Sequence, residues 1–237
     1  MDLSEFTIYW DMDGVVADYV GGMRALGGMA ADQYTEDRIE MLNRSGTQSS
    51  EKRAAYDMIK GTDFYYRLPI LPGSVGLYRK YRDHNPHVLT ASPKFGATET
   101  DYYVNPFWLG AQYNKRRWME EVFLPQVEHP NARSEVPRVP MADDRFICTI
   151  SVKKHSFINR HHTEHQVLVD DRRDNCVDWA RAGGIAIMHV SPLQTDAALE
   201  ALISGSREGF ISVSHGADHT LGMIHGLADP RKWSEME

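Results

Sequence analysis

The sequence predicts an α/β protein: a Rossmann-like parallel sheet flanked by helices, with a small helical cap inserted after the first strand. Short apolar runs of strand length alternate along the chain with helical patterns. Several of these runs end directly on polar side chains, which is where open α/β sheets place their binding sites. The polar stretch that follows the first run contains nothing that resembles a central strand.

Composition limits the classes of function. A chain of 237 residues can form one large domain or a core with a smaller insert. Its formal charge of −7 argues against a stable nucleic-acid partner, but a bound divalent cation would still allow a small phosphorylated substrate. Cys148 and Cys176 are expected to be reduced packing residues. The sequence has no apolar run long enough to span a membrane and no room for a signal peptide before the first strand, so we expect a cytoplasmic protein that binds no membrane. A homodimer is possible on the sequence alone.

The first predicted strand, residues 6–10, ends on Asp11, which is followed by Asp13 and Gly14. If the chain turns after Asp11, one carboxylate can point at a substrate while the other reaches over it. Gly14 permits a sharp turn because it has no Cβ. The alternative is an ordinary Asp/Gly turn without a function. A calcium-binding loop is disfavoured, because the residues after Gly14 do not supply the further oxygen ligands that such a loop needs.

The next stretch predicts the insert. Residues 19–26 read as a short helix and residues 29–60 as weakly amphipathic helices, and the prolines and glycine of 69–73 mark a boundary. We therefore expect a cap at 19–71 and a core made of 1–18 and 72–237. A helix over 75–82 leads back into this core.

Hydroxyl side chains follow the second predicted strand, Val88-Leu89. Thr90 and Ser92 could form hydrogen bonds to a ligand, and the neighbouring backbone N–H groups could hold an anion. The alternative is a helix N-cap, with Ser92 placed before Pro93 at the first helical position. Further on, residues 114–123 predict an amphipathic helix and the proline-containing residues 125–140 a surface loop.

Two later runs complete the set of polar strand ends. A strand over 146–152 is followed by Lys153 and Lys154, and a strand over 167–169 ends on Asp170-Asp171. Adjacent carboxylates repel each other unless a cation lies between them. A helix over 174–182 and a final strand over 185–190 follow; beyond a helix at 195–203, the Gly/His-rich tail shows no periodicity. His161, His162 and His165 lack further ligands at matching spacing, which disfavours a zinc site there.

Taken in order, these strand ends resemble the haloacid dehalogenase (HAD) superfamily of phosphatases and phosphotransferases. Four segments are similar to its 5'(3')-deoxyribonucleotidase family: Asp-Met-Asp-Gly-Val-Val-Ala-Asp from Asp11, Tyr-Arg-Leu-Pro-Ile-Leu-Pro-Gly from Tyr66, Leu-Thr-Ala-Ser-Pro from Leu89, and Leu-Val-Asp-Asp-Arg from Leu168. The resemblance covers most of residues 6–190. The proline-rich loop, the gap between the lysine and Asp170, and the tail depart from the family pattern.

The resemblance implies a HAD-like core and Mg²⁺-dependent hydrolysis of a phosphate monoester, with a nucleotide as the expected substrate. Asp11 would be the nucleophile and Asp13 the general acid and base. Mg²⁺ would be held by Asp11, by the backbone carbonyl of Asp13 and by Asp170, with help from Asp171. The phosphoryl group would be bound by Thr90, Ser92 and Lys154.

In the cap, the resemblance implies substrate recognition by Tyr65, Tyr66 and Arg67, with Tyr19 and Phe64 as further candidates for stacking on the substrate.

Three other functions stay open at this point. The substrate could be a sugar phosphate or a phosphorylated polynucleotide end. The chain could be a catalytically silent nucleotide-binding protein, although such a protein needs neither a nucleophile nor an acid. A phosphomutase is the third alternative. The aromatic residues of the insert could equally serve to pack the cap.

Overall fold

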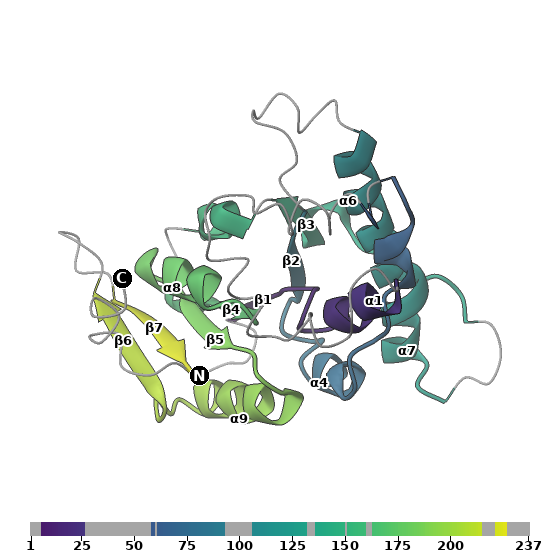
Figure 1. Cartoon of the computed structure of the whole chain (residues 1–237). Coiled ribbons are helices and arrows are strands. Elements are labelled where there is room, and N and C mark those ends of the chain that lie inside the picture. Colours follow the sequence, from purple (N-terminus) through teal and green to yellow (C-terminus); the bar gives the residue numbers. More distant parts are fainter. Residues whose placement is uncertain are drawn as a thin grey trace. The chain divides into compact units, whose positions relative to one another are not determined.

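The computed structural model describes residues 6–26, 58–59, 61–92, 106–131, 136–149, 151–159, 163–214 and 221–226 (Figure 1). The chain divides into two compact units, each assembled from segments that are separate in the sequence. The first unit comprises Met1–Val16, Pro72–Ala91 and Ala142–Glu237, and the second comprises Ala17–Leu71 and Ser92–Met141.

The first unit is built on a seven-stranded sheet with the strand order β3-β2-β1-β4-β5-β7-β6. Every neighbouring pair is parallel except β6 and β7, which are antiparallel. This is the mostly parallel α/β sheet that the sequence predicts. The strands are β1 (Thr7–Trp10), β2 (His87–Ala91), β3 (Phe146–Thr149), β4 (Gln166–Asp170), β5 (Ile185–Met188), β6 (Phe210–Ser214) and β7 (Leu221–His225).

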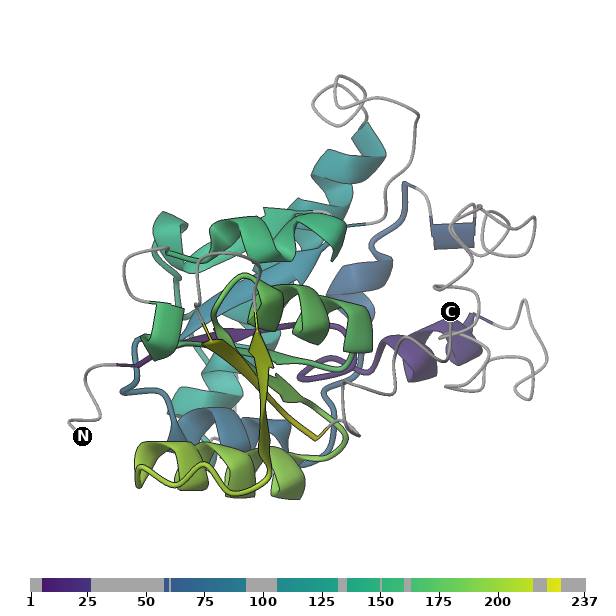
Figure 2. The same ribbon diagram turned by 90° about the vertical axis from the view of Figure 1, so that its left-hand side faces the viewer.

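Helices lie on both faces of this sheet (Figure 2). Along β1 the side chains alternate, so that Tyr9 contacts Trp179 of α8 while Trp10 contacts Tyr78 of α4. Strands covered on both faces are apolar throughout. The helical segments of this unit are α4 (Ser74–Lys80), η5 (Asp143–Arg145), η6 (Ser151–Phe157), η7 (Thr163–His165), α8 (Arg173–Arg181) and α9 (Pro192–Ile203).

Strand order places a topological switch point between β1 and β4. From β1 the chain moves outward through β2 to β3, and it then returns to the other side of β1 to form β4. In open parallel sheets, the crevice at the carboxyl ends of two such strands is the usual ligand site. Val167, Leu168 and Val169 of β4 are fully buried, which stabilises the fold by roughly 1.5–3 kcal/mol for each side chain, so the strand that ends at this switch point is firmly held.

The sheet does not end at β5, and the prediction that residues 185–190 form the final strand is wrong. β7 pairs in parallel with β5, and β6 adds an antiparallel edge strand. The sequence pattern of the tail does not reveal β7, because a glycine stands where an apolar side chain would be expected. A Cβ on Gly222 would lie 1.8 Å from the carbonyl oxygen of Ala180 in α8. The helix therefore packs directly on the backbone of β7, without the apolar side chain that a strand pattern requires.

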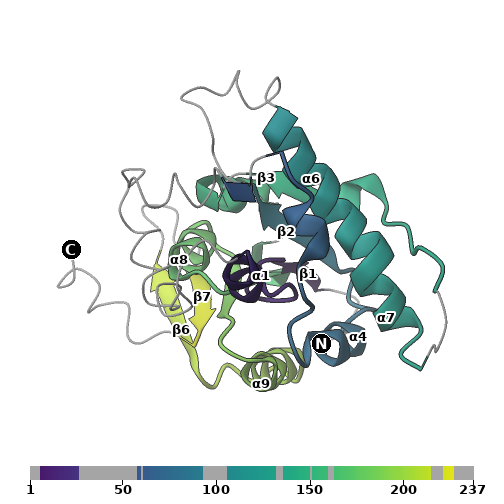
Figure 3. The ribbon, with the colours of Figure 1, turned by 45° about the vertical axis from the view of Figure 1, so that its right-hand side comes forward.

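The second unit centres on one long helical stretch. α6 (Pro106–Trp118) continues through a π-helical segment, η4 (Met119–Phe123), into α7 (Leu124–Glu128) (Figure 3). The predicted loop over 125–140 therefore starts too early, because Pro125 is tolerated in the first turn of α7. Trp118 donates to the carbonyl oxygen of Leu68 at 2.7 Å, which ties this stretch to η3 (Phe64–Arg67). Asp18 caps the short helix α1 (Tyr19–Ala25).

The predicted helices over 19–26, 75–82, 174–182 and 195–203 are confirmed, with ends shifted by up to three residues. The helix predicted over 114–123 is also present, but it already begins at Pro106, and its last five residues are π-helical. The division into units differs from the predicted boundaries in two places, since residues 17–18 and 92–141, expected in the core, group with the predicted cap segment. Most of the predicted helices over 29–60 lie outside the described residues, as do Pro93, His161 and His162. Among the described helices, none has the length and apolar character needed to cross a membrane.

Candidate active site

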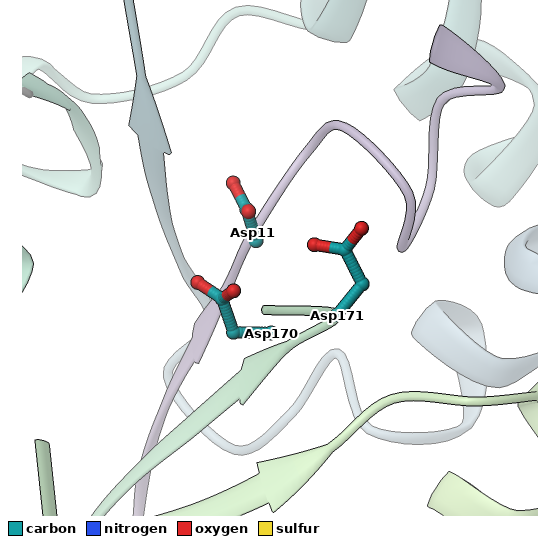
Figure 4. Close-up of side chains that lie close together, drawn as sticks. All are labelled: Asp11, Asp170 and Asp171. Carbon is teal, nitrogen blue, oxygen red and sulfur yellow. The ribbon is translucent and has the colours of Figure 1, made fainter. Parts of the chain in front are cut away.

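Three carboxylates meet at the switch point between β1 and β4. Asp11 follows the last residue of β1, Asp170 ends β4, and Asp171 comes next in the chain. The backbone N–H of Asp11 donates to the carbonyl oxygen of Val169 at 2.9 Å, so the two strands remain paired up to the site. One oxygen from each carboxylate lies within 4.8 Å of the others, and the three side chains converge in Figure 4. These are three of the four residues that the sequence analysis names as candidate metal ligands, Asp13 being the fourth.

Lys154 bridges two of these carboxylates. It lies in η6, the short 3₁₀ helix after β3, and its Nζ is 2.8 Å from Oδ2 of Asp11 and 2.7 Å from Oδ2 of Asp170. Its side chain is only 1% exposed, whereas Lys153 is exposed. Burial alone would favour the neutral amine, but the charges of Asp11 and Asp170 outweigh it and raise the pKa of Lys154 above its usual range. Lys154 is thus a buried, charged counter-ion of the site.

Asp170 is held from several directions. Its Oδ1 accepts a hydrogen bond from the backbone N–H of Arg172 at 2.9 Å, and its backbone carbonyl accepts one from His189 at 2.8 Å. The Nδ2 of Asn175 lies 3.0 Å from each oxygen of the carboxylate. Asn175 is absent from the sequence-predicted site. Its one detectable signal is position, because the first turn of a helix that follows a strand end faces back toward that end.

Gly14 allows the turn after Asp13 to pass close to Asp171. Its φ is +77°, and a Cβ at this position would lie 2.1 Å from Oδ2 of Asp171. Burial, together with the negative charges of Asp170 and Asp11, raises the pKa of Asp171 well above its ordinary value. The direction of this shift shows that the three carboxylates repel one another even with Lys154 beside them.

Asp13 occupies the same turn, half-buried, between Asp11 and Gly14. In the described part of the chain, the three-carboxylate cluster does not include its side chain. This position is compatible with the two predicted roles of Asp13, whose carboxyl would act on the substrate while its backbone carbonyl alone contacts the cation. Met12 donates its backbone N–H to Oδ1 of Asp11 at 2.7 Å, which orients the Asp11 carboxylate within the turn.

Thr90 and Ser92 follow the neighbouring strand. Thr90 lies near the carboxyl end of β2, the strand paired with β1, and is completely buried. Ser92 follows that strand, is also buried, and belongs to the second unit. A direct role of either hydroxyl in phosphoryl binding stays a prediction.

The three cap residues predicted to recognise substrate all lie in the second unit and have partners there. Tyr65 is buried, with Nζ of Lys115 4.6 Å from its ring centroid. Tyr66 donates its hydroxyl hydrogen to Oε2 of Glu121 at 3.0 Å, and the exposed Arg67 pairs with Asp63 at 2.8 Å. These contacts favour the packing alternative for Tyr65 and leave Tyr66 and Arg67 the more accessible of the three.

The donor set fits a magnesium ion. Mg²⁺ prefers oxygen ligands and is commonly bound by one or two carboxylates together with substrate phosphate. The cluster offers such oxygens at the end of a buried sheet, with one ammonium for three carboxylates. Of the predicted metal ligands, Asp11, Asp170 and Asp171 come together through their side chains, and Asp13 could contribute its backbone carbonyl.

Comparisons with known proteins give distant likenesses. No protein-family model matches the sequence, and no curated protein matches it significantly. A solved hydrolase from Streptococcus pneumoniae TIGR4 aligns over 82% of this chain and 97% of its own, with 10% identity and a TM-score of 0.45. A haloacid dehalogenase-like family hydrolase from Streptococcus pneumoniae aligns over 86% of this chain and 100% of its own, with 13% identity and a TM-score of 0.46.

Proposed function

We propose that this chain is a Mg²⁺-dependent phosphatase that hydrolyses a phosphate monoester through an aspartyl-phosphate intermediate, with a (deoxy)nucleoside monophosphate as substrate. One observation carries the proposal: Asp11 and Asp170, which are far apart in the sequence, share the buried Lys154 at the switch point of a mostly parallel sheet. The resemblance of the motifs to the deoxyribonucleotidase family supports the choice of substrate.

Asp11 is the proposed nucleophile. Its carboxylate is oriented by the N–H of Met12 and stabilised as an anion by Lys154 at 2.8 Å. An Asp11 oxygen attacks phosphorus, the bond to the leaving oxygen breaks, and Asp13 gives that oxygen its proton. In the second step Asp13 takes a proton from water, whose oxygen attacks phosphorus and releases inorganic phosphate. Asp11 is regenerated as a carboxylate.

The carboxylates of Asp11 and Asp170 and the backbone carbonyl of Asp13 would hold Mg²⁺, with Asp171 assisting directly or through water. When bound, the ion neutralises charge on the phosphoryl oxygens. Lys154 provides a second positive charge at the same place, and Thr90 and Ser92 would donate hydrogen bonds to the equatorial oxygens. These donors stabilise charge that must be accommodated in any in-line phosphoryl transfer.

Selection of the nucleotide is proposed for the second unit, with Tyr66 and Arg67 as the residues that contact base or sugar. A sugar phosphate or a phosphorylated polynucleotide end is the alternative substrate, since the same phosphoryl chemistry would serve all three. A catalytically silent nucleotide-binding protein is disfavoured, because binding alone requires neither the Asp11 nucleophile nor the Asp13 acid.

The test is phosphate release from deoxynucleoside monophosphates, sugar phosphates and phosphorylated oligonucleotides, each with and without Mg²⁺. We expect Mg²⁺-dependent release that is highest for a nucleotide, and a loss of about 10⁴-fold or more in Asp11→Asn. Asp13→Ala should also be inactive. The matched control is Asp174→Asn, an exposed carboxylate on the neighbouring helix, which should keep full activity. Near-normal turnover by Asp11→Asn would refute the nucleophile assignment.

A further inference from the structure

Asn175 approaches the carboxylate of Asp170 in an unusual way. It lies in the first turn of α8, its side chain is buried at 4% exposure, and its Nδ2 is 3.0 Å from Oδ1 and 3.0 Å from Oδ2 of Asp170. An amide that donated a hydrogen bond to a single acceptor would lie close to only one carboxylate oxygen. Asn175 instead contacts both oxygens of the same carboxylate.

Equal distances to the two oxygens place Nδ2 in the plane that passes midway between them, and because it donates to both oxygens it lies on their outer side, near the line that bisects the carboxylate. A hydrogen-bond donor on that line lies at the open end of the group, beyond the two oxygens. A cation that binds both oxygens of a carboxylate at once must occupy the same position. The Asn175 amide therefore fills the chelating position of Asp170.

The remaining contacts fix Asp170 in this orientation. The N–H of Arg172 donates to Oδ1 at 2.9 Å and Lys154 donates to Oδ2 at 2.7 Å, so that the carboxylate cannot rotate away from Asn175 without losing both. Asp170 is itself completely buried. A cation can accordingly approach only one of its oxygens.

We infer that Asn175 is a positioning residue that restricts Asp170 to coordination through a single oxygen and so favours Mg²⁺ over Ca²⁺. Mg²⁺ requires near-octahedral geometry with six ligands, whereas Ca²⁺ accepts six to eight oxygens and often takes both oxygens of one carboxylate. Closing the chelating position removes a ligand that only the larger ion would use. This inference rests on the magnesium site of the proposed function.

The experiment measures binding of Mg²⁺ and of Ca²⁺ to the full chain by titration calorimetry, without substrate. The variant is Asn175→Ala, which opens the chelating position and removes the amide donor. The control is Val177→Ala on the same helix, a buried residue of the apolar core, which loses packing without touching Asp170. Circular dichroism and urea unfolding establish that each variant is folded, and Asn175→Ser replaces the alanine variant if that one is not.

We expect the ratio of the Ca²⁺ to the Mg²⁺ dissociation constant to fall by about 10-fold in Asn175→Ala, the size of effect that residues behind a metal ligand commonly have. In Val177→Ala the ratio should stay at the wild-type value, whatever that variant loses in stability. A ratio in the Asn175 variant within about twofold of wild type, or a shift toward Mg²⁺, would overturn the inference.

Failure of the inference and failure of the proposed function have different signatures. A wild-type chain that binds Mg²⁺ but releases no phosphate from any substrate contradicts the phosphatase and leaves the metal-selectivity result valid. Phosphate release with an unchanged selectivity ratio in the Asn175 variant contradicts the role of Asn175 alone. A wild-type chain that binds neither ion contradicts both.

Discussion

At Gly14 the backbone turns with φ of +77° and passes directly against the carboxylate of Asp171. Two separate costs would follow from a side chain here. An L-residue is strained at positive φ, by about 1–2 kcal/mol, and its Cβ would collide with an Asp171 oxygen that the structure places 2.1 Å away. The residue that shapes the turn thus also determines where a candidate metal ligand can lie.

Gly14→Ala is therefore expected to be destabilised by about 2 kcal/mol or more in urea unfolding, and to weaken Mg²⁺ binding by displacing Asp171. Gly205→Ala separates the two costs, because Gly205 has φ of +83° but no atom of the described residues lies within 4 Å of its added Cβ. We expect that control to show only the backbone cost, with unchanged Mg²⁺ affinity. Equal losses in the two variants would show that the close approach to Asp171 is energetically unimportant.

Lys154 is the residue on which the electrostatics of the site depend. Replacing it by methionine keeps the volume but leaves Asp11 and Asp170 without their ammonium, and breaking a buried ion pair costs about 3–5 kcal/mol. Lys154→Met should therefore have a clearly lower melting temperature in the absence of divalent ions, and added Mg²⁺ should restore part of the loss.

The control for Lys154→Met is Lys153→Met, which changes the exposed neighbour and should leave both the melting temperature and its response to Mg²⁺ unchanged. If the two variants melted at the same temperature, Lys154 would not be the counter-ion of the site.

Single residues can be predicted where their position in the sequence is energetically unfavourable without a ligand or counter-ion. Asp170-Asp171 stands out because adjacent carboxylates repel each other, and Asp11 stands out because it ends an apolar strand. The pattern alone does not separate Lys153 from Lys154, since it cannot show which of two neighbours a 3₁₀ turn points inward; the choice of Lys154 comes from the resemblance. Asn175 was missed because a neutral amide in a helix is energetically ordinary, so the sequence gives no sign that it contacts the site.

At the scale of elements, the strands that carry the site were easier to predict than the edge of the sheet. β1 and β4 are apolar on both faces because helices cover both, and their burial leaves little ambiguity. β7 has a glycine where α8 packs and β6 lies at the edge, so neither shows a continuous apolar run. Their pairing depends on contacts with β5 and α8 that are distant in the sequence.

In the second unit, Glu120 of η4 joins the helical stretch to the segment that follows it. Its carboxylate is 1% exposed and accepts hydrogen bonds from Arg116 at 3.1 Å, from Arg138, and from the backbone N–H of Met141 at 3.0 Å. Burial alone would raise the pKa of Glu120, but the bonds from Met141, Arg138 and Arg116 outweigh it and hold that pKa below its usual value.

Because the pKa of Glu120 is lower in the folded chain, its charge stabilises the fold above the unfolded-state pKa of about 4.5, and this contribution is lost as the pH falls through the folded value. Glu120→Gln should lower stability by about 2 kcal/mol near pH 7, and the difference from wild type should shrink in acid. Urea unfolding between neutral and acidic pH measures it. Glu121→Gln, at a more exposed ion pair, is the control with a smaller loss. A gap that widened in acid would contradict this assignment.

For the whole molecule, the excess of carboxylates over ammonium groups at the site predicts stabilisation by Mg²⁺. An ion that binds only the folded chain adds about 2.7 kcal/mol at 100 times its dissociation constant. Thermal unfolding of wild type should shift upward with Mg²⁺ but not with the same ionic strength of NaCl. Asp171→Asn should reduce the shift and Asp174→Asn should keep it; an equal shift in both variants would place the ion elsewhere.

The sequence predicted the sheet-based core because strand-length apolar runs are local signals, and the insert at 19–71 stays a prediction from its Pro/Gly boundary. It did not identify residues 92–141 as part of the second unit. That grouping depends on contacts such as Trp118 to Leu68 and Asn114 to Thr62, which join segments far apart in the chain. Long-range packing of this kind leaves no local trace.

The pairing of β1 with β4 has a consequence for synthesis in the cell. Trp10 lies opposite Val169, so the ribosome must make most of the chain before the central strand has both of its neighbours. At about 5–20 residues per second, β1 would wait roughly 8–30 s after translation for β4 to follow. During that interval the apolar segment Thr7–Trp10 lacks its full cover, which makes the nascent chain a natural client for chaperones that bind near the ribosomal exit.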